Sequence, residues 1–315
     1  TYQSVDLFKS GARSSTNVQN EIEKYDLLSI NKKSIEALFT NAPDNFKLII
    51  PSNKRSNLSL LLVEVQLPLM ELEAAPSGNK IKYRPGKHYR GIIEGQEGSW
   101  AALSVYEDEV YGLISEERSE SSYVIGKIKG EDTHIFYADE DLKGPQNFSC
   151  NTSDSNLPQL KYEEIFNKSA GTSRSNGKCV QLYFEVDNDI VINKGGETGA
   201  INYITAVYNQ MATLYANEQI TTSISKILVW TQTSPYSGTN TGTLLEQFGT
   251  TRTSFEGDLA MLVSYKGNGG IAYVNGLCAF QKKFSMGYSS IGSSYNNVPT
   301  YSWTVNVLAH EFGLV

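Results

Sequence analysis

Short apolar stretches bounded by turn residues follow one another through the first part of the chain. Many of them alternate apolar and polar side chains, the period-two pattern typical of half-buried β-strands. We expect strands at Phe46–Ile50, Leu58–Leu67, Arg90–Gly95, Ser99–Glu107, Glu109–Ser115, Ser122–Ile128 and Thr133–Ala138. This pattern predicts a β-rich first region, folded as a meander or a sandwich, in which no catalytic set of side chains stands out.

The composition changes between Gly144 and Gly177, where Pro, Asn, Ser and Gly replace the apolar stretches. Such a segment is typical of a solvated linker. We therefore expect a β-rich domain at residues 1–150, a linker or activation segment at residues 151–177, and a second domain at residues 178–315. Because proteolysis concentrates in exposed polar stretches, Arg174 is a candidate site for an activating cleavage.

After the linker the hydrophobic period alternates between strand and helix. Strands are expected at Cys179–Val186, Ser225–Thr233, Asp258–Tyr265 and Gly269–Val274. A long helix with Thr198 as its N-cap follows the first strand, because apolar residues then recur at helical spacing from Ile201 to Tyr215. A weaker helical pattern covers Thr243–Phe255. A last helix is expected from Trp303, because Val305, Leu308 and Phe312 share one apolar stripe. This order predicts a largely parallel sheet with covering helices.

Composition narrows the classes of partner. The chain has 315 residues, enough for two domains, and a formal net charge of −7. A nucleic-acid partner is not expected, because such a surface is normally basic. No apolar run approaches the ~20 residues that cross a bilayer, so no membrane span is expected. Three cysteines are too few for a disulfide scaffold, and their odd number leaves at least one thiol unpaired within the chain.

The stretch LAHEFGLV, from Leu308 to Val315, carries candidate chemistry. On a helix, two histidines four residues apart can hold one zinc ion while the glutamate after the first acts as general base. Here His310 and Glu311 are present, but the residue four positions after His310 is Leu314, which cannot bind zinc. A His-Glu pair alone also occurs by accident in structural helices, so the rest of the chain decides its meaning.

The second half resembles the metzincin zinc proteases of the adamalysin/reprolysin branch. The similar stretches are VQLYFEVDND, AINYITAVYNQMATLY, DLAMLVSY, GGIAYVNGLC, GYSSI and VNVLAHEFG, in this order. The stretch HYRGIIEGQEGSWAALSVYEDEVYGLIS of the first half resembles the pro-domains of that branch. The resemblance implies a β-rich pro-domain followed by an α/β catalytic domain. Its mixed, mostly parallel sheet would have an antiparallel edge strand and long helices, and a C-terminal subdomain would be missing.

This resemblance also implies roles for particular residues. Zinc would be the cofactor, His310 a ligand and Glu311 the general base. The pro-domain would act as an intramolecular inhibitor. A cysteine in the pro-segment of related zymogens binds the zinc, so Cys150 is a candidate latency ligand, with a buried structural thiol as the alternative.

Substrate and disulfide contacts are expected in the same half. The main chain of the edge strand would bind an extended peptide substrate as an added strand; its residues are Gly270, Ile271, Ala272 and Tyr273. Cys179 and Cys278 are candidates for a disulfide with each other. In relatives, the cysteine at the position of Cys278 often pairs with one beyond the active-site helix.

The departure at Leu314 leaves three explanations open. Either the sequence is truncated or lacks a stretch, or it is an engineered fragment cut inside the zinc-binding helix, or it is a natural relative that has lost its zinc site. We expect a latent, secreted zinc metalloendopeptidase whose incomplete site leaves this chain inactive. The alternatives are a catalytically inactive secreted binding or decoy module on a protease fold, and an adhesive β-domain joined to an unrelated α/β partner.

Overall fold

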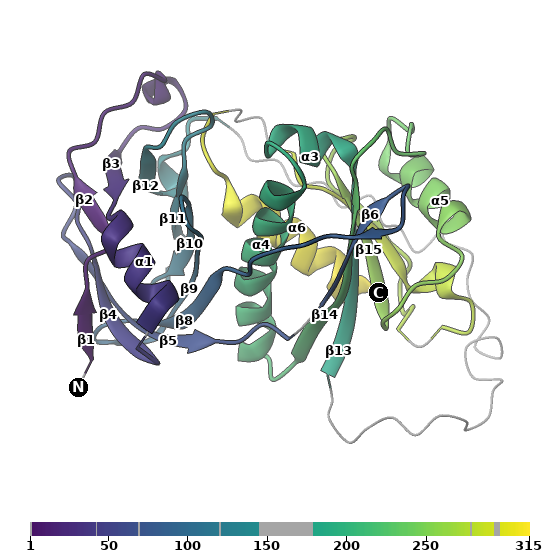
Figure 1. Ribbon diagram of the computed structural model, residues 1–315, viewed down its shortest axis with the longest axis horizontal. Coiled ribbons are helices and arrows are strands. Elements are labelled where there is room, and N and C mark those ends of the chain that lie inside the picture. Colours follow the sequence, from purple (N-terminus) through teal and green to yellow (C-terminus); the bar gives the residue numbers. More distant parts are fainter. Residues whose placement is uncertain are drawn as a thin grey trace.

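The computed structural model describes residues 2–41, 43–68, 70–119, 121–144, 179–277, 279–292 and 297–315. Two β-sheets lie on either side of a pair of helices (Figure 1). The first sheet has ten strands in the order β1 (Gln3–Val5), β4 (Asn45–Ile50), β5 (Leu58–Val65), β8 (Lys87–Ile93), β9 (Gln96–Val105), β10 (Val110–Ser115), β11 (Ser122–Lys127), β12 (His134–Ala138), β3 (Tyr25–Ile30) and β2 (Phe8–Ser10). All seven strands expected from the alternating pattern are present in this sheet.

The ten-stranded sheet is rolled rather than flat. Strands β1 and β2 lie at its two opposite edges, although only two residues separate Val5 from Phe8 in the chain. Three peptide steps span at most ~10 Å, so the two edges must approach each other. The inside of the roll is filled by one apolar cluster that includes Phe46, Leu62 and Tyr89. The meander is confirmed for β8 to β12, and a single rolled sheet replaces the alternative of a two-sheet sandwich.

The second sheet has seven strands in the order β16 (Gly270–Ala272), β17 (Met286–Ser290), β15 (Leu259–Ser264), β13 (Cys179–Val186), β14 (Thr221–Trp230), β6 (Glu71–Ala75) and β7 (Asn79–Lys80). From β17 to β6 the neighbours are parallel, whereas β16 is antiparallel to β17 and β7 to β6. The mostly parallel sheet with an antiparallel edge strand is therefore confirmed. Strands β6 and β7 were not expected, and they come from the first half of the chain.

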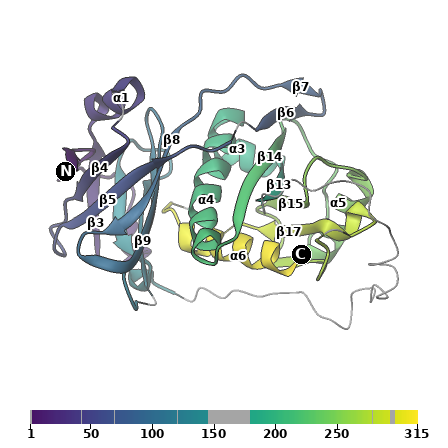
Figure 2. The same ribbon diagram turned by 90° about the horizontal axis from the view of Figure 1, so that it is seen from below.

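Helices cover both faces of the second sheet (Figure 2). On one face lie α3 (Asn188–Asn193), α4 (Glu197–Asn217) and α6 (Tyr301–Leu314), and on the other lies α5 (Thr241–Thr251). Helix α1 (Lys32–Asn41) packs on the first sheet, and single 3-10 turns occupy Val18–Asn20, Asp139–Asp141 and Lys282–Ser285. Within the described part of the chain, no helix is long and apolar enough to cross a bilayer.

The start of α4 corrects one expectation. Gly196, not Thr198, is the N-cap, and Glu197 is the first helical residue. Gly195 and Gly196 both have positive φ, at 76° and 126°. Glycine adopts this region without a Cβ penalty, so the pair turns the chain sharply from α3 into α4 two residues earlier than a threonine cap would.

One apolar cluster joins the two halves of the chain, which are the described residues up to 144 and those from 179 onward. It contains Tyr111 and Val124 from the first sheet, Ile204 and Tyr301 from α4 and α6, and Phe184 from the second sheet. Helices α4 and α6 are thus buried between the two sheets, and this arrangement determines where the end of α6 lies.

Candidate functional site

The last turns of α6 carry His310 and Glu311 and are held from two sides. Phe312 packs its ring edge-on against Phe184 of β13, with 5.4 Å between ring centroids. The hydroxyl of Tyr215, on α4, donates a hydrogen bond of 2.7 Å to the carbonyl oxygen of Ala309. The expected apolar stripe of this helix is present, because Val305, Leu308 and Phe312 are all buried. The position of the His-Glu pair therefore follows from packing against α4 and the second sheet.

Glu311 is the most unusual ionisable residue of this region. Its side chain is 0% exposed, and among the described residues neither carboxylate oxygen has a hydrogen-bond partner. Burial without a compensating partner disfavours the charged form and raises the pKa of Glu311 from 4.5 to about 8. A carboxyl group with a pKa near the working pH is well suited to accept and return a proton.

The edge strand β16 lies directly against this carboxyl group. A Cβ atom at Gly270 would come within 2.3 to 2.5 Å of the Glu311 side chain. At such a distance a larger residue fits only if the Glu311 side chain or one of the two elements moves. The absence of a side chain at position 270 is what allows the backbone of β16 to lie beside Glu311.

The register of β16 divides the four residues expected to bind substrate into two whose backbone groups face β17 and two whose backbone groups face away from it. Tyr273 N donates to Met286 O at 3.2 Å, and Ser290 N donates to Gly269 O at 2.9 Å. Because backbone groups alternate in direction along a strand, those of Ile271 and Tyr273 point toward β17. The backbone groups of Gly270 and Ala272 point to the side of β16 that faces away from β17.

The described residues supply only part of a metal site. Within them, no three His, Cys, Asp or Glu side chains are grouped closely enough to hold an ion. His310, which is half-buried, is one imidazole donor beside a buried carboxyl group. Zinc sites take three or four protein ligands, so the described residues do not form a complete zinc site.

Three of the expected site residues, Cys150, Arg174 and Cys278, lie outside the described residues. Cys179 is described, and it is a free, exposed thiol whose Sγ lies 3.3 Å from Ser223 Oγ. Because Cys278 lies outside the described residues, the disulfide expected between Cys179 and Cys278 stays a prediction.

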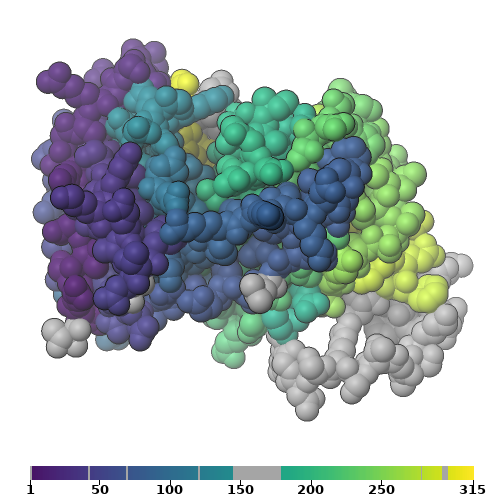
Figure 3. Space-filling model, in the orientation of Figure 1, coloured from purple at the N-terminus to yellow at the C-terminus, as the bar shows by residue number. Residues whose placement is uncertain are grey.

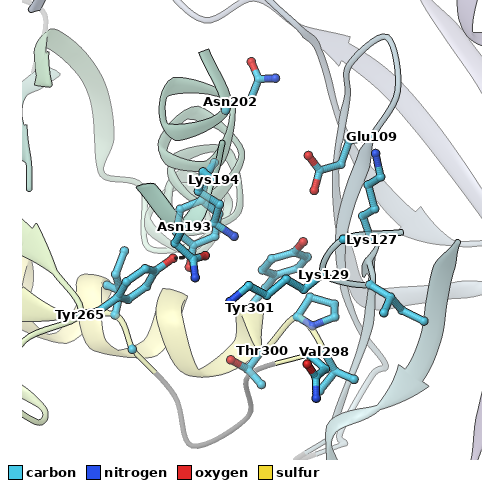
Figure 4. A pocket seen from close by; sticks show the side chains of 18 of the residues that line it. Glu109, Lys127, Lys129, Asn193, Lys194, Asn202, Tyr265, Val298, Thr300 and Tyr301 are labelled. Atoms are coloured by element: carbon cyan, nitrogen blue, oxygen red, sulfur yellow. Dashed lines mark hydrogen bonds between the residues drawn. The ribbon is translucent and has the colours of Figure 1, made fainter. Parts of the chain in front are cut away.

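A cavity of about 1140 Å³ lies between the two halves at the other end of α6 (Figure 4). Glu109, Lys127 and Lys129 line it from the first half, and Lys194 and Tyr301 from the second. Burial lowers the pKa of Lys194 to about 8 and raises that of Glu109. The cavity contacts α6 at its first turn rather than at His310 or Glu311, so it is a feature of the contact between the halves.

Sequence reasoning missed two parts of this site. Tyr215 belongs to the apolar stripe of α4, and nothing in that pattern indicates that its hydroxyl holds the last turn of α6. Gly270 was identified as a strand residue, but its contact with Glu311 joins segments about forty residues apart. The doubled glycine at 269–270 was the only available signal, and it did not indicate a partner.

Comparison with known proteins agrees with the chemistry of this region. The family model described as metallo-peptidase family M12 (Reprolysin_5) matches residues 176–313. Among solved structures, metalloproteinase-II from Bacteroides fragilis matches with 11% identity and a TM-score of 0.47, covering 89% of this chain and 82% of that one. At that identity and TM-score the structural likeness assigns no function. No curated protein matches the chain.

Proposed function

We propose that this chain is the latent form of a zinc-dependent metalloendopeptidase, with His310 as a zinc ligand and Glu311 as general base. The M12 family match over residues 176–313 supports a metalloprotease. The observation that carries the assignment of roles is the Glu311 carboxyl group. It is buried, follows a histidine and lies against an edge strand, and it lacks a hydrogen-bond partner within the described part of the chain.

The residues of this chain would divide the work of peptide hydrolysis. The edge strand β16 would pair with an extended peptide along its backbone and place the peptide carbonyl near α6. Glu311 would take a proton from the attacking water and pass it to the leaving amine. Zinc, when bound, would act as a Lewis acid and would lower the pKa of the water bound to it toward ~7. His310 would be one of its ligands, and the others would come from outside the described residues.

Latency and location are further parts of this proposal. The first half would act as an intramolecular inhibitor, Cys150 would bind the zinc in the latent form, and a cut near Arg174 would begin activation. A secreted enzyme of this kind would act on peptides or proteins outside the cell. Replacing Cys150 by Ala should then produce spontaneous activity, and unchanged latency would exclude the thiol as the inhibitory ligand.

The central test compares two substitutions in the natural protein, after the linker has been cut and the first half has been released. Glu311→Gln should reduce chelator-sensitive hydrolysis of an unfolded protein substrate by about 10²-fold or more, since general-base catalysis typically contributes 10²–10⁴. Glu246→Gln removes an exposed glutamate of α5 in the same half and should have no effect. Equal activity of the two variants, or activity that survives a chelator, would rule out the proposed mechanism.

A further inference from the structure

A hairpin from the first half completes the sheet of the second half. We call residues 71–80, which form β6, β7 and the turn between them, the clasp hairpin. The chain leaves β5 of the first sheet, passes α4, pairs along β14, and returns to β8 of the first sheet. In the space-filling view its blue atoms lie across the green surface of the second half (Figure 3).

The clasp hairpin is joined to β14 by a regular parallel ladder. Five residue pairs are in register, from Lys226 with Glu71 to Trp230 with Ala75. Just beyond them, Thr231 N donates to Ala75 O at 3.0 Å. The alternate carbonyl groups, of Leu72 and Ala74, accept hydrogen bonds from Ile81 and Gly78 on the outer side. The backbone of β6 is therefore hydrogen-bonded on both sides, as in an interior strand.

Side chains reinforce this ladder at one point. Lys226 of β14 is only 8% exposed, and its Nζ lies 2.6 Å from Glu73, 3.5 Å from Glu256 and 3.9 Å from Glu71. Two of these three carboxylates belong to the clasp hairpin. A nearly buried ammonium group is costly without such partners, so withdrawal of β6 would remove most of its compensation.

The apolar side chains of β6 contact both faces of the second sheet. Leu72 packs against the cluster beneath α4, and Ala75 belongs to the cluster beneath α5. Helix α4 therefore has the first sheet on one side and, on the other, a sheet that contains a strand of the first half (Figure 2). The halves cannot move apart as rigid bodies unless β6 is stripped from β14.

We propose that the edge of β14 is the docking surface that holds the first half on the second half, with the acidic strand Glu71–Ala75 as its occupant. Because of it, the two halves stay together after the chain between them has been cut. This interaction goes beyond the proposed peptidase activity and does not rest on it. Any process that separates the halves must first unzip this strand.

The test cuts the chain and asks whether the halves separate. A recognition sequence for a site-specific protease is placed within residues 151–177, and complete cutting is verified on a denaturing gel. Gel filtration under native conditions should then give a single peak that contains both fragments. Separation of the wild-type fragments in native buffer would overturn the proposal.

Two charge reversals show whether the strand is responsible. Glu73→Lys places a like charge against Lys226, and it should weaken the cut complex about tenfold or more and lower the urea concentration at which the fragments part. Glu64→Lys is the matched control, because Glu64 forms an ion pair of 2.7 Å with Lys87 inside the first half. It should leave fragment separation unchanged, and equal behaviour of the two variants would refute the role of the strand.

A milder substitution covers the case in which Glu73→Lys does not fold. Glu73→Gln keeps a hydrogen-bonding side chain but removes the charge, and it should weaken the complex in the same direction by a smaller factor. In the uncut protein, backbone amides of β14 should exchange hydrogen faster in Glu73→Gln than in Glu64→Gln. Equal exchange rates would show that β6 does not protect this edge.

Discussion

Replacing Glu311 by Gln should change how the stability of the metal-free protein depends on pH. In the folded protein the carboxyl group is buried without a hydrogen-bond partner among the residues that the structure describes, and this burial raises its pKa from 4.5 to about 8. Between these two values the unfolded chain has released the proton while the folded protein keeps it. Raising the pH through this window therefore favours the unfolded chain.

The size of the effect follows from the two pKa values. A rise from 4.5 to about 8 corresponds to about 5 kcal/mol of unfolding free energy, at about 1.4 kcal/mol per pH unit. This loss is absent below pH 4.5 and complete above pH 8. Glutamine has nearly the same shape and cannot ionise, so the variant should lack this part of the pH dependence.

Urea unfolding of wild type and Glu311→Gln, in chelator at pH 5, 7 and 9, measures this difference. The variant should gain stability relative to wild type as the pH rises, by about 3 to 5 kcal/mol from pH 5 to pH 9. Other groups titrate equally in both proteins and cancel. Glu246→Gln, an exposed position on α5, controls for loss of a charge. A constant difference at all three pH values would show that Glu311 does not carry a raised pKa.

Two further predictions concern the edge strand and the first sheet. Gly270→Ala should lower the free energy of unfolding, measured in thermal melts, by about 1–3 kcal/mol, because the new methyl group overlaps Glu311. Gly249→Ala is the control and should not lower it, because its methyl group would meet Lys283 only at 3.6 Å. Burial lowers the pKa of His88 from 6.5 to about 3. The folded protein therefore keeps its full stability above pH 6.5, and protonation of the unfolded chain lowers the free energy of unfolding by up to about 5 kcal/mol as the pH falls toward 3. His88→Gln should flatten acid unfolding over that window, and an unchanged acid limb would contradict the assignment.

Much of the strand and helix content could be predicted from local pattern. The strand at Cys179–Val186 has the same bounds in the structure as in the expectation, and the helix expected from Trp303 begins at Tyr301. These elements have clear periodicity because each buries one face or is buried on both. The His-Glu pair could be placed on the expected last helix, but its proposed role came from the resemblance of the rest of the chain, because the second histidine of the motif is absent.

Strand β6 shows where local pattern ends. Its sequence, ELEAA, contains no β-branched residue, and in the chain it lies far from its partner β14. Its conformation depends on a ladder and an ion pair supplied by residues more than 150 positions away. No local signal could have placed it in the second sheet.

The sequence by itself determined seven strands of the first sheet, the alternation of strands and helices after residue 178, and the placement of His310 and Glu311 on one helix. These follow from side-chain periodicity and residue chemistry, which act between near neighbours. Only the tertiary structure decided that Gly270 lies against the Glu311 carboxyl group and that β6 closes the sheet of the other half. Both depend on burial and pairing between distant segments, because a raised pKa and a strand ladder exist only once those segments meet.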